Sequence, residues 1–253
     1  MGWRDACTKF YRAAQKVIAP DLKYSQLLYE QVLFEHSPGK EIWLDLGCGR
    51  GFLPPWREEQ ERDLAKRPKS LIGLDYDFAS LRDNKILGRK VLGDVSCLPF
   101  SDTAFDFVTS NMVFEHLKEP VAQLKDIFRI LKPGGELIFH TPNSRGYGPL
   151  CAKLIPEEIK DRIIWYLQRR KPEDVFPTYY RINTPEVIVE AAASAGFSVV
   201  SLRLIVSTPL LIMIPPLLVI ELMWIRFLMT RLGKPFRSNI VAVLQKPRAN
   251  SVS

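Results

Sequence analysis

LDLGCGRG, residues 44–51, places three glycines directly after a short apolar run, and this stretch decides the fold that the sequence implies. The run IWLDLG, residues 42–47, predicts a buried strand that ends at the first glycine. Glycines at 47, 49 and 51 permit positive φ and let a ligand approach bare backbone. A turn of this kind at the start of a helix can receive a negatively charged group.

The GxGxG pattern by itself is shared by several kinds of ligand-binding loop. The dinucleotide-binding pattern GxGxxG requires a glycine at position 52, where this chain has Phe52. A nicotinamide-dependent reductase is therefore a weaker interpretation of the loop.

Strand-like and helix-like segments alternate along the chain after this loop. Further strands are predicted at 70–77, 89–95, 104–112, 136–143, 198–207 and 238–246, and helices at 55–66, 78–86, 119–132 and 185–195. The last of these helices has Thr184 as its N-cap, Pro185 at its first position and Gly196 as its stop. The alternation predicts an α/β fold with a mostly parallel sheet and helices on both faces.

Length and composition favour one globular domain. The 253 residues suffice for one sizeable core. We expect an N-terminal helical segment at 1–40, a ligand-binding core at 41–143, an insertion or lid at 144–183 and a C-terminal part at 184–253 with an apolar insertion at 208–233. The insertion contains a helix-like piece, PEEIKDRIIWYLQRR, at 156–170.

The four cysteines and the N-terminus bear on the compartment. Cys7, Cys48, Cys97 and Cys151 form no CxxC pair, so neither a disulfide framework nor a metal site is predicted. The first twenty residues lack the apolar core of a secretory signal. These features predict a reducing, cytoplasmic location.

Carboxylates follow two of the predicted strands. Asp75 closes the second strand, where an acid can accept both hydroxyls of a ribose. Asp94 closes the third strand, where a carboxylate can receive an exocyclic amino group of a base. An acid after a strand is often only a helix cap, so the combination with the glycine loop carries more weight than either acid.

At this point the chain resembles a known family. LDLGCGRG, GLDYD, GDVSCLPFSDTAFDFVTSNMVFEHL and LKPGGELIFHTPN are together similar to the class I S-adenosylmethionine-dependent methyltransferases, in the branch that acts on small molecules and quinone rings. The likeness covers residues 41–143, and YYRINTPEVIVEAAASAGF at 179–197 extends it. It implies a Rossmann-like sheet of seven strands with an antiparallel last strand.

The resemblance also implies which residues hold S-adenosylmethionine. Gly47, Cys48, Gly49 and Gly51 would line its methionine part, with Asp45 near the amino group; Asp75 and Tyr76 would hold the ribose, Asp94 and Val95 the adenine edge, and Asn111 would lie beside the sulfonium. The pair Pro54-Pro55 departs from the smooth helix that usually follows the loop, which leaves the start of the first helix open.

Histidines are the candidates for a general base. A sulfonium methyl is already activated, so the protein mainly aligns the nucleophile and excludes water. An oxygen nucleophile would still benefit from proton removal by a histidine. His116 and His140 follow or end strands on the ligand side of the expected sheet, and His36 is remote. Structural roles are open alternatives for both candidates.

The most apolar stretch is PLLIMIPPLLVIELMWIRFLM, residues 209–229, with only Glu221 and Arg226 as charges. It is just long enough to span a bilayer, but its ends feed two strands that should be neighbours, and a single span would separate them by about 30 Å. Its three prolines predict a bent, re-entrant hairpin whose second arm is a helix from Leu217 to Leu232, ended by Gly233.

Basic residues flank this stretch. From Arg203 to Arg248 seven Lys or Arg stand against Glu221, which is +6 of the chain's +7. Snorkelling arginines and anionic lipid attraction would suit a peripheral or monotopic membrane contact through 209–231. A dimer interface, a substrate lid and ordinary core remain alternatives.

These observations predict methyl transfer to a small-molecule or lipid-linked acceptor, such as a prenylated quinone precursor or another lipid, at a membrane surface. A non-catalytic adapter that uses the apolar segment to bind a partner is the alternative. Nucleic acid is not expected as a partner, because the basic residues occur among aliphatic side chains and not among base-stacking aromatics. A homodimer is possible.

Overall fold

A computed structural model describes residues 2–149 and 177–248 of the chain. The described residues form two compact units, each assembled from segments that are distant in the sequence. Unit 1 contains residues up to 27 together with 142–149 and 204–239, and unit 2 contains 28–141, 178–203 and the residues from 240 onward. The helix predicted at 156–170 lies outside the described residues, and the predicted domain boundaries stay a prediction.

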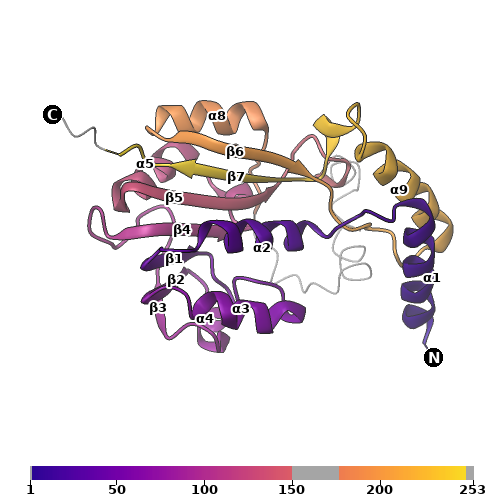
Figure 1. Cartoon of the computed structure of the whole chain (residues 1–253), viewed down its shortest axis with the longest axis horizontal. Helices are drawn as coiled ribbons and strands as arrows, with labels where there is room; N and C mark the ends of the chain where they lie inside the picture. Colours follow the sequence, from indigo (N-terminus) through magenta and orange to yellow (C-terminus); the bar gives the residue numbers. More distant parts are fainter. Residues whose placement is uncertain (1, 150–176, 249–253) are drawn as a thin grey trace. The chain divides into compact units, whose positions relative to one another are not determined.

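A seven-stranded sheet is the framework of unit 2 (Figure 1). Its strands are β1 (Ile42–Leu46), β2 (Ser70–Asp75), β3 (Arg89–Leu92), β4 (Phe105–Asn111), β5 (Leu131–Pro142), β6 (Ser198–Ile205) and β7 (Asn239–Gln245). The order is β3-β2-β1-β4-β5-β7-β6, and the pairs from β3 to β5 are parallel. The predicted α/β class and sheet are confirmed.

The last strand, β7, runs antiparallel to β5, as the resemblance implied. The amide of Gly134 donates to the carbonyl of Lys246, and the amide of Lys246 donates to the carbonyl of Gly135. The same pairing corrects the predicted start of β5. The helix predicted at 119–132 ends at Ile130, and the strand begins at Leu131 and not at 136, because Gly134 and Gly135 already belong to the ladder.

Helices accompany the strands of unit 2. They are α2 (Ser25–His36), α3 (Glu58–Ala65), α4 (Phe78–Asp83), α5 (Pro120–Ile130) and α8 (Pro185–Ser194), with 3-10 turns η1 (Pro55–Arg57) and η2 (Phe114–His116). The two prolines after the glycine loop lie at the start of η1, where Pro54 is the N-cap and Pro55 the first residue. This 3-10 turn leads directly into α3. The predicted cap at Thr184 is confirmed, since its hydroxyl accepts from the amide of Val187.

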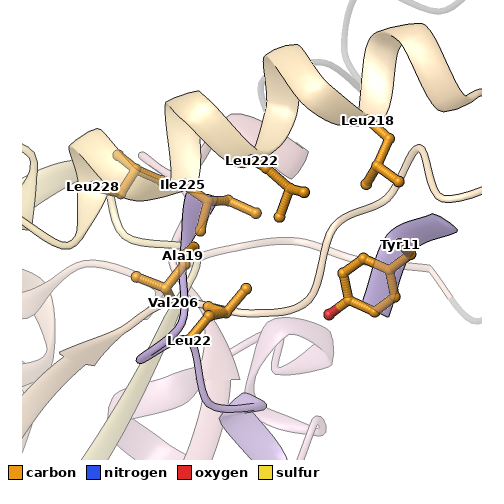
Figure 2. Close-up of a cluster of buried hydrophobic side chains, with 8 residues drawn as sticks. All are labelled: Tyr11, Ala19, Leu22, Val206, Leu218, Leu222, Ile225 and Leu228. Atoms are coloured by element: carbon orange, nitrogen blue, oxygen red, sulfur yellow. The ribbon is translucent and has the colours of Figure 1, made fainter. Parts of the chain in front are cut away.

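Unit 1 is built on two helices that pack side by side, α1 (Trp3–Ile18) and α9 (Pro215–Leu228) (Figure 1). Figure 2 shows the cluster between them and the segment that follows β6. Its buried members are Tyr11, Ala19, Leu22, Val206, Leu218, Leu222, Ile225 and Leu228. Four of them lie on one face of α9, so part of the apolar stretch is ordinary core.

The apolar stretch has the bent course that its prolines predict, with different helix bounds. Pro215 and Pro216 occupy the first turn of α9. The helix ends at Leu228, four residues before the predicted end, where the amide of Met229 closes it on the carbonyls of Ile225 and Phe227. The predicted end at Leu232 is therefore wrong, and a 3-10 turn, η4 (Lys234–Phe236), follows.

Residues 2–149 and 177–248 contain no helix that is both long and apolar enough to cross a membrane.

Glu221 explains how the front of the apolar stretch folds back on α9. This side chain is buried, and its carboxylate accepts from the amides of Leu210 and Leu211 at 2.7 and 2.8 Å. The hydroxyl of Tyr147 donates to the same carboxylate at 2.8 Å. One acid thus satisfies two turn amides that an apolar environment would leave unpaired.

Replacing Glu221 with alanine should destabilise the fold. The change leaves three partly buried donors without their acceptor, so we expect the free energy of unfolding to fall by about 2–4 kcal/mol. Urea unfolding followed by circular dichroism measures this. Glu190→Ala on the exposed side of α8 is the matched control and should change little; equal losses for both variants would contradict this role of Glu221.

Candidate functional site

The sheet places its ligand-binding edge where the strand order reverses. β1 lies between β2 and β4, so the chain leaves β1 towards one side of the sheet and returns on the other. In open α/β sheets such a switch point opens a crevice at the carboxyl ends of the strands. Gly47, Asp75, Asp94 and Asn111 all follow or end strands at this edge. The structure therefore brings together residues that lie tens of positions apart.

The glycine loop turns sharply after β1. Gly47 and Gly49 have φ of 69° and 47°, a region that favours glycine. The amides of Gly47 and Cys48 both donate to the carbonyl of Leu74 in β2, and the amide of Gly51 donates to Cys48. Cys48 is buried under the loop against Gly73, where an added Cβ would lie 2.6 Å from its sulfur.

The three loop glycines serve different purposes. A Cβ at position 47 would lie 2.3 Å from Val113 Cγ2, and one at position 51 would lie 2.9 Å from both carboxylate oxygens of Glu61. A Cβ at Gly49 would meet nothing within 4 Å. Of the three loop glycines, Gly49 alone has open space beside its Cα. Gly47 and Gly51 instead allow Val113 and Glu61 to pack closely against the loop.

Asp75 ties the loop to the end of β2. Its Oδ2 accepts from the amide of Gly49 at 2.8 Å, and its Oδ1 accepts from the amide of Asp77 at 2.9 Å. The side-chain amide of Asn84 holds the same loop from another side by donating to the Gly49 carbonyl at 3.1 Å. The carboxylate is buried, yet it retains lone pairs for a ligand hydroxyl.

Tyr76 lies among carboxylates at this edge. Burial, and then the charges of Asp75, Asp77 and Asp94, raise the pKa of its hydroxyl to about 12. The ring is still more than half exposed, and the Asp94 carboxylate accepts from the amide of Ser96 at 2.7 Å. Val95 beside it is buried. This edge is therefore strongly acidic and would attract a cationic ligand.

Asn111 and His140 form one network across β4 and β5. The side-chain amide of Asn111 donates to the carbonyl of Phe52 at 3.2 Å, so its Oδ1 serves as the acceptor for His140 Nδ1 at 2.9 Å. The imidazole is buried and stacks on Tyr29 with ring centroids 5.5 Å apart. Burial lowers the pKa of His140 to about 3, so the ring is neutral near pH 7.

His116 has a different environment in the turn η2. Its side chain is about a quarter exposed, and its Nε2 lies 3.9 Å from Glu115 Oε1. Glu115 is buried, and its carboxylate accepts from the hydroxyl of Thr141, to which Asn183 donates in turn. Of the two predicted bases, His116 has a partly exposed ring, whereas the ring of His140 is buried. The third histidine, His36, lies by Glu136 at the other end of β5.

A buried acid lies directly under the loop. Asp45 accepts from the hydroxyl of Thr109 at 2.5 Å, while Trp43 donates to that hydroxyl at 2.6 Å. Asp45 Oδ2 is buried and has no hydrogen-bond partner among the described residues. Burial raises the pKa of this carboxyl well above its ordinary value. An unpartnered acceptor here points to a missing donor.

Glu61 of α3 also supports the glycine loop, although no sequence motif marks it. This side chain is buried, and its Oε1 accepts from the amide of Phe52 at 2.7 Å. Burial raises the pKa of the carboxyl to about 7. Glu61 and Leu64 are the buried residues of α3, and their spacing of three could have identified this face in an otherwise charged helix.

Phe52 also explains why the dinucleotide pattern is broken. The side chain is buried against Trp43, with ring centroids 5.6 Å apart. Position 52 therefore belongs to the core and not to a phosphate-binding turn.

A cavity of about 210 Å³ opens beside the glycine loop, α3 and α4, and neither Asp75 nor Asn111 is among its lining residues. Its lining consists of Arg50, Gly51, Leu53, Pro55, Glu58, Glu61, Asp83, Lys85 and Ile86.

Comparison with known proteins identifies the kind of domain. The family model described as a methyltransferase domain matches residues 44–139. A Mycolicibacterium smegmatis protein described as a probable S-adenosylmethionine-dependent methyltransferase is 31% identical over 127 residues, which is 49% of this chain and 46% of that protein. The malonyl-[acyl-carrier protein] O-methyltransferase of Serratia marcescens is 32% identical over 108 residues, 41% of this chain and 39% of its own.

Solved structures share the fold. A Haloferax volcanii methyltransferase in complex with the activator Trm112 matches with a TM-score of 0.57 and 21% identity, over 98% of this chain and 99% of that one. The matches to the two curated relatives span less than half the length of either protein.

Alanine at Gly47 and at Gly49 should separate the cost of a steric clash from the cost of backbone strain. Gly47→Ala forces a Cβ onto Val113 at positive φ, so we expect a loss of stability of about 2–4 kcal/mol. Gly49→Ala has only the backbone strain, about 1–2 kcal/mol. Gly88→Ala, with open space and ordinary φ, is the control. Thermal unfolding measures all three; equal effects at 47 and 49 would refute the distinction.

Glu61 should make stability depend on pH. The folded chain holds a proton at Glu61 up to about pH 7, whereas the unfolded carboxyl releases it near its ordinary pKa of 4.5. This contribution to stability is therefore lost as pH rises from about 4.5 to 7, by roughly 3 kcal/mol. Glu61→Gln should flatten that slope in urea unfolding, whereas Glu59→Gln on the exposed face of α3 should not. An unchanged slope in Glu61→Gln would count against this role of Glu61.

Proposed function

Since this chain carries a class I S-adenosylmethionine-dependent methyltransferase domain, we propose that it transfers a methyl group from S-adenosylmethionine to a small, lipophilic or lipid-linked acceptor at a membrane surface. The observation that carries the proposal is the glycine loop locked onto Asp75, with an acidic edge beside it. The acceptor and the membrane contact are the new parts of the proposal.

The residues at this edge fit a cationic adenosyl ligand. The open space at Gly49 allows close approach to the backbone. The buried, unpartnered Oδ2 of Asp45 is an acceptor suited to an ammonium group. Asp75 and Asp94 present carboxylates to ribose hydroxyls and to a base amino group, with Tyr76 between them in sequence. Gly47, Cys48, Gly51, Val95 and Asn111 complete the proposed binding set.

S-adenosylmethionine supplies an activated methyl group, so the chain's own task is alignment and exclusion of water. We propose that His116 accepts the proton of an oxygen nucleophile, because its ring is partly accessible. The predicted role of His140 as a base remains a proposal, to which its buried, neutral ring lends less support. Its contact with Asn111 suits a positioning residue.

The apolar stretch supports a lipophilic acceptor. It is inserted between β6 and β7 of the methyltransferase sheet, and α9 exposes Ile220 and Met223 by 65% and 62% of their surface. A solvent-facing helix usually presents polar side chains on this side. We propose that 209–231 makes a peripheral contact with the cytoplasmic side of a membrane, where a prenylated quinone precursor or another lipid would be available. The acceptor of the Serratia marcescens relative is carrier-linked by its name.

Labelled S-adenosylmethionine tests the acceptor class directly. The full chain is incubated with methyl-labelled S-adenosylmethionine and a total lipid extract, and the organic phase is analysed. We expect a labelled lipid, and we expect Asp75→Asn to lower the rate at limiting cofactor by roughly 10- to 100-fold, because a charged acceptor at the loop is lost. Asp63→Asn on the exposed side of α3 is the control.

Two other outcomes of this experiment would contradict parts of the proposal. Label found only in water-soluble products would overturn the lipophilic acceptor but not methyl transfer. An absence of both turnover and cofactor binding by calorimetry would favour a non-catalytic adapter that uses the apolar segment to bind a partner.

A further inference from the structure

Helix α1 carries an apolar stripe that does not belong to the core. Its side facing α9 buries Cys7 and Tyr11. Trp3, Phe10 and Val17 recur every seven residues on another side and are exposed by 61%, 42% and 82%. Exposed Ala6 and Ala13 continue the same stripe. Helix α1 therefore carries apolar side chains on a solvent-exposed side as well as on the side that packs against α9.

Basic side chains border this stripe. Lys9 and Lys16 each precede a stripe residue, and Arg12 lies on the polar side of the helix. Aromatic and aliphatic residues on one face with Lys and Arg on the other are typical of helices that lie in the interface of a membrane. Long basic side chains can extend to head groups while their stems cover apolar surface.

Helix α9 has a second outward apolar face. Leu218, Leu222 and Ile225 point into the cluster of Figure 2. On the opposite side Leu217, Ile220, Met223, Trp224 and Phe227 are exposed. Arg226 is exposed next to Phe227, and Arg231 and Lys234 follow the helix. The two packed helices therefore both present apolar residues with neighbouring cations to solvent.

Charge is concentrated in the same unit. The described residues of unit 1 include ten Lys or Arg against Asp5, Asp21 and Glu221, a formal charge of +7. The described residues of unit 2 include 19 Lys or Arg and 20 Asp or Glu, a formal charge of −1. The basic character of the chain thus belongs to the unit that exposes the apolar stripes, and not to the unit with the acidic ligand edge.

We propose that α1 forms, with α9, a membrane-binding platform that lies in the head-group region of an anionic bilayer. Trp3, Phe10 and Val17 enter the acyl boundary, and Arg12 and Lys16 contact lipid phosphates. This inference rests on the proposed membrane contact of 209–231 and extends it to a helix near the N-terminus. The platform would hold the unit against the surface from which a lipophilic acceptor comes.

The chemistry of the surface favours an anionic bilayer over a second copy of the chain. Pairing two copies through this surface would bring two units of +7 together, which repel each other. A bilayer with anionic lipids instead supplies both an apolar phase and negative charge, which attracts each Lys or Arg near its surface. The exposed tryptophans, Trp3 and Trp224, also suit the interface, because indole is amphipathic.

Vesicle sedimentation of the full chain tests the platform in three pairs of substitutions. Vesicles contain equal parts of phosphatidylcholine and phosphatidylglycerol, and vesicles of phosphatidylcholine alone are compared. The first pair is Trp3→Ser with Phe10→Ser, the second is Arg12→Glu with Lys16→Glu, and the third is Ile220→Ser with Trp224→Ser. Trp56→Ser with Phe78→Ser, also an exposed Trp and Phe but in unit 2, is the matched control. Thermal unfolding confirms that each variant folds.

We expect the wild type and the control to bind anionic vesicles equally. The first pair should weaken partitioning by at least about tenfold through lost apolar contact. The second should weaken it by roughly 30-fold or more and reduce the preference for anionic lipid. Vesicle binding could instead be unchanged by both pairs of substitutions in α1 and lost only with Ile220→Ser and Trp224→Ser. That result would overturn the role of α1 and leave the proposed contact of 209–231 intact.

Further outcomes separate this inference from the proposed function. If the wild type does not bind either vesicle, the platform is wrong, whereas labelled lipid product would still support methyl transfer. If light scattering shows a dimer that Trp3→Ser with Phe10→Ser disrupts, the surface is an interface between copies and the inference is overturned. Vesicle binding without any methyl transfer would leave the platform standing and remove the enzyme proposal.

Discussion

The Asp75 carboxylate is the constraint on which the site depends. It accepts the amide of Gly49 from the loop after β1 and the amide of Asp77 from the turn after β2, so one side chain fixes both turns at the sheet edge. The loop can reach this carboxylate only because Gly47 and Gly49 adopt positive φ. Because residue 49 is glycine, no side chain occupies the open space beside its Cα. An acidic, backbone-lined edge follows from these few bonds.

Two buried carboxyl groups, Asp45 and Glu61, lie beneath this edge and oppose the stability of the fold. Both have raised pKa values because burial disfavours their charged forms. Thr109 partly compensates Asp45, and the Phe52 amide partly compensates Glu61. Buried carboxyl groups of this kind occur where the fold must hold a loop in one conformation. They are common at ligand-binding sites, where the loss of stability that they cause is tolerated. The other unit shows the opposite character, since its excess charge is positive and its two helices expose apolar stripes.

Much of this arrangement could be predicted from residue patterns. Apolar runs that end at Gly47 and Asp75 located β1 and β2, because buried parallel strands need few polar residues. The caps at Thr184 and Gly196 were equally local signals. By contrast, the early start of β5 depends on pairing with Lys246, more than a hundred residues away. The end of α9 and the bonds of Glu221 depend on tertiary contacts, and no local pattern reveals that a single acid in an apolar stretch binds turn amides. The role of Glu61 was missed because its neighbours in α3 are charged and solvated.

A crystal structure of the chain with S-adenosylhomocysteine, the product form of the proposed cofactor, would show whether the edge at Asp75 binds this ligand. We expect the ribose of the ligand to contact the Asp75 carboxylate, its amino acid part to run along the backbone at Gly49, and the hydrogen bond between these two residues to persist. A ligand bound in the cavity beside α3 and α4, or no ligand at saturating concentration, would contradict this expectation.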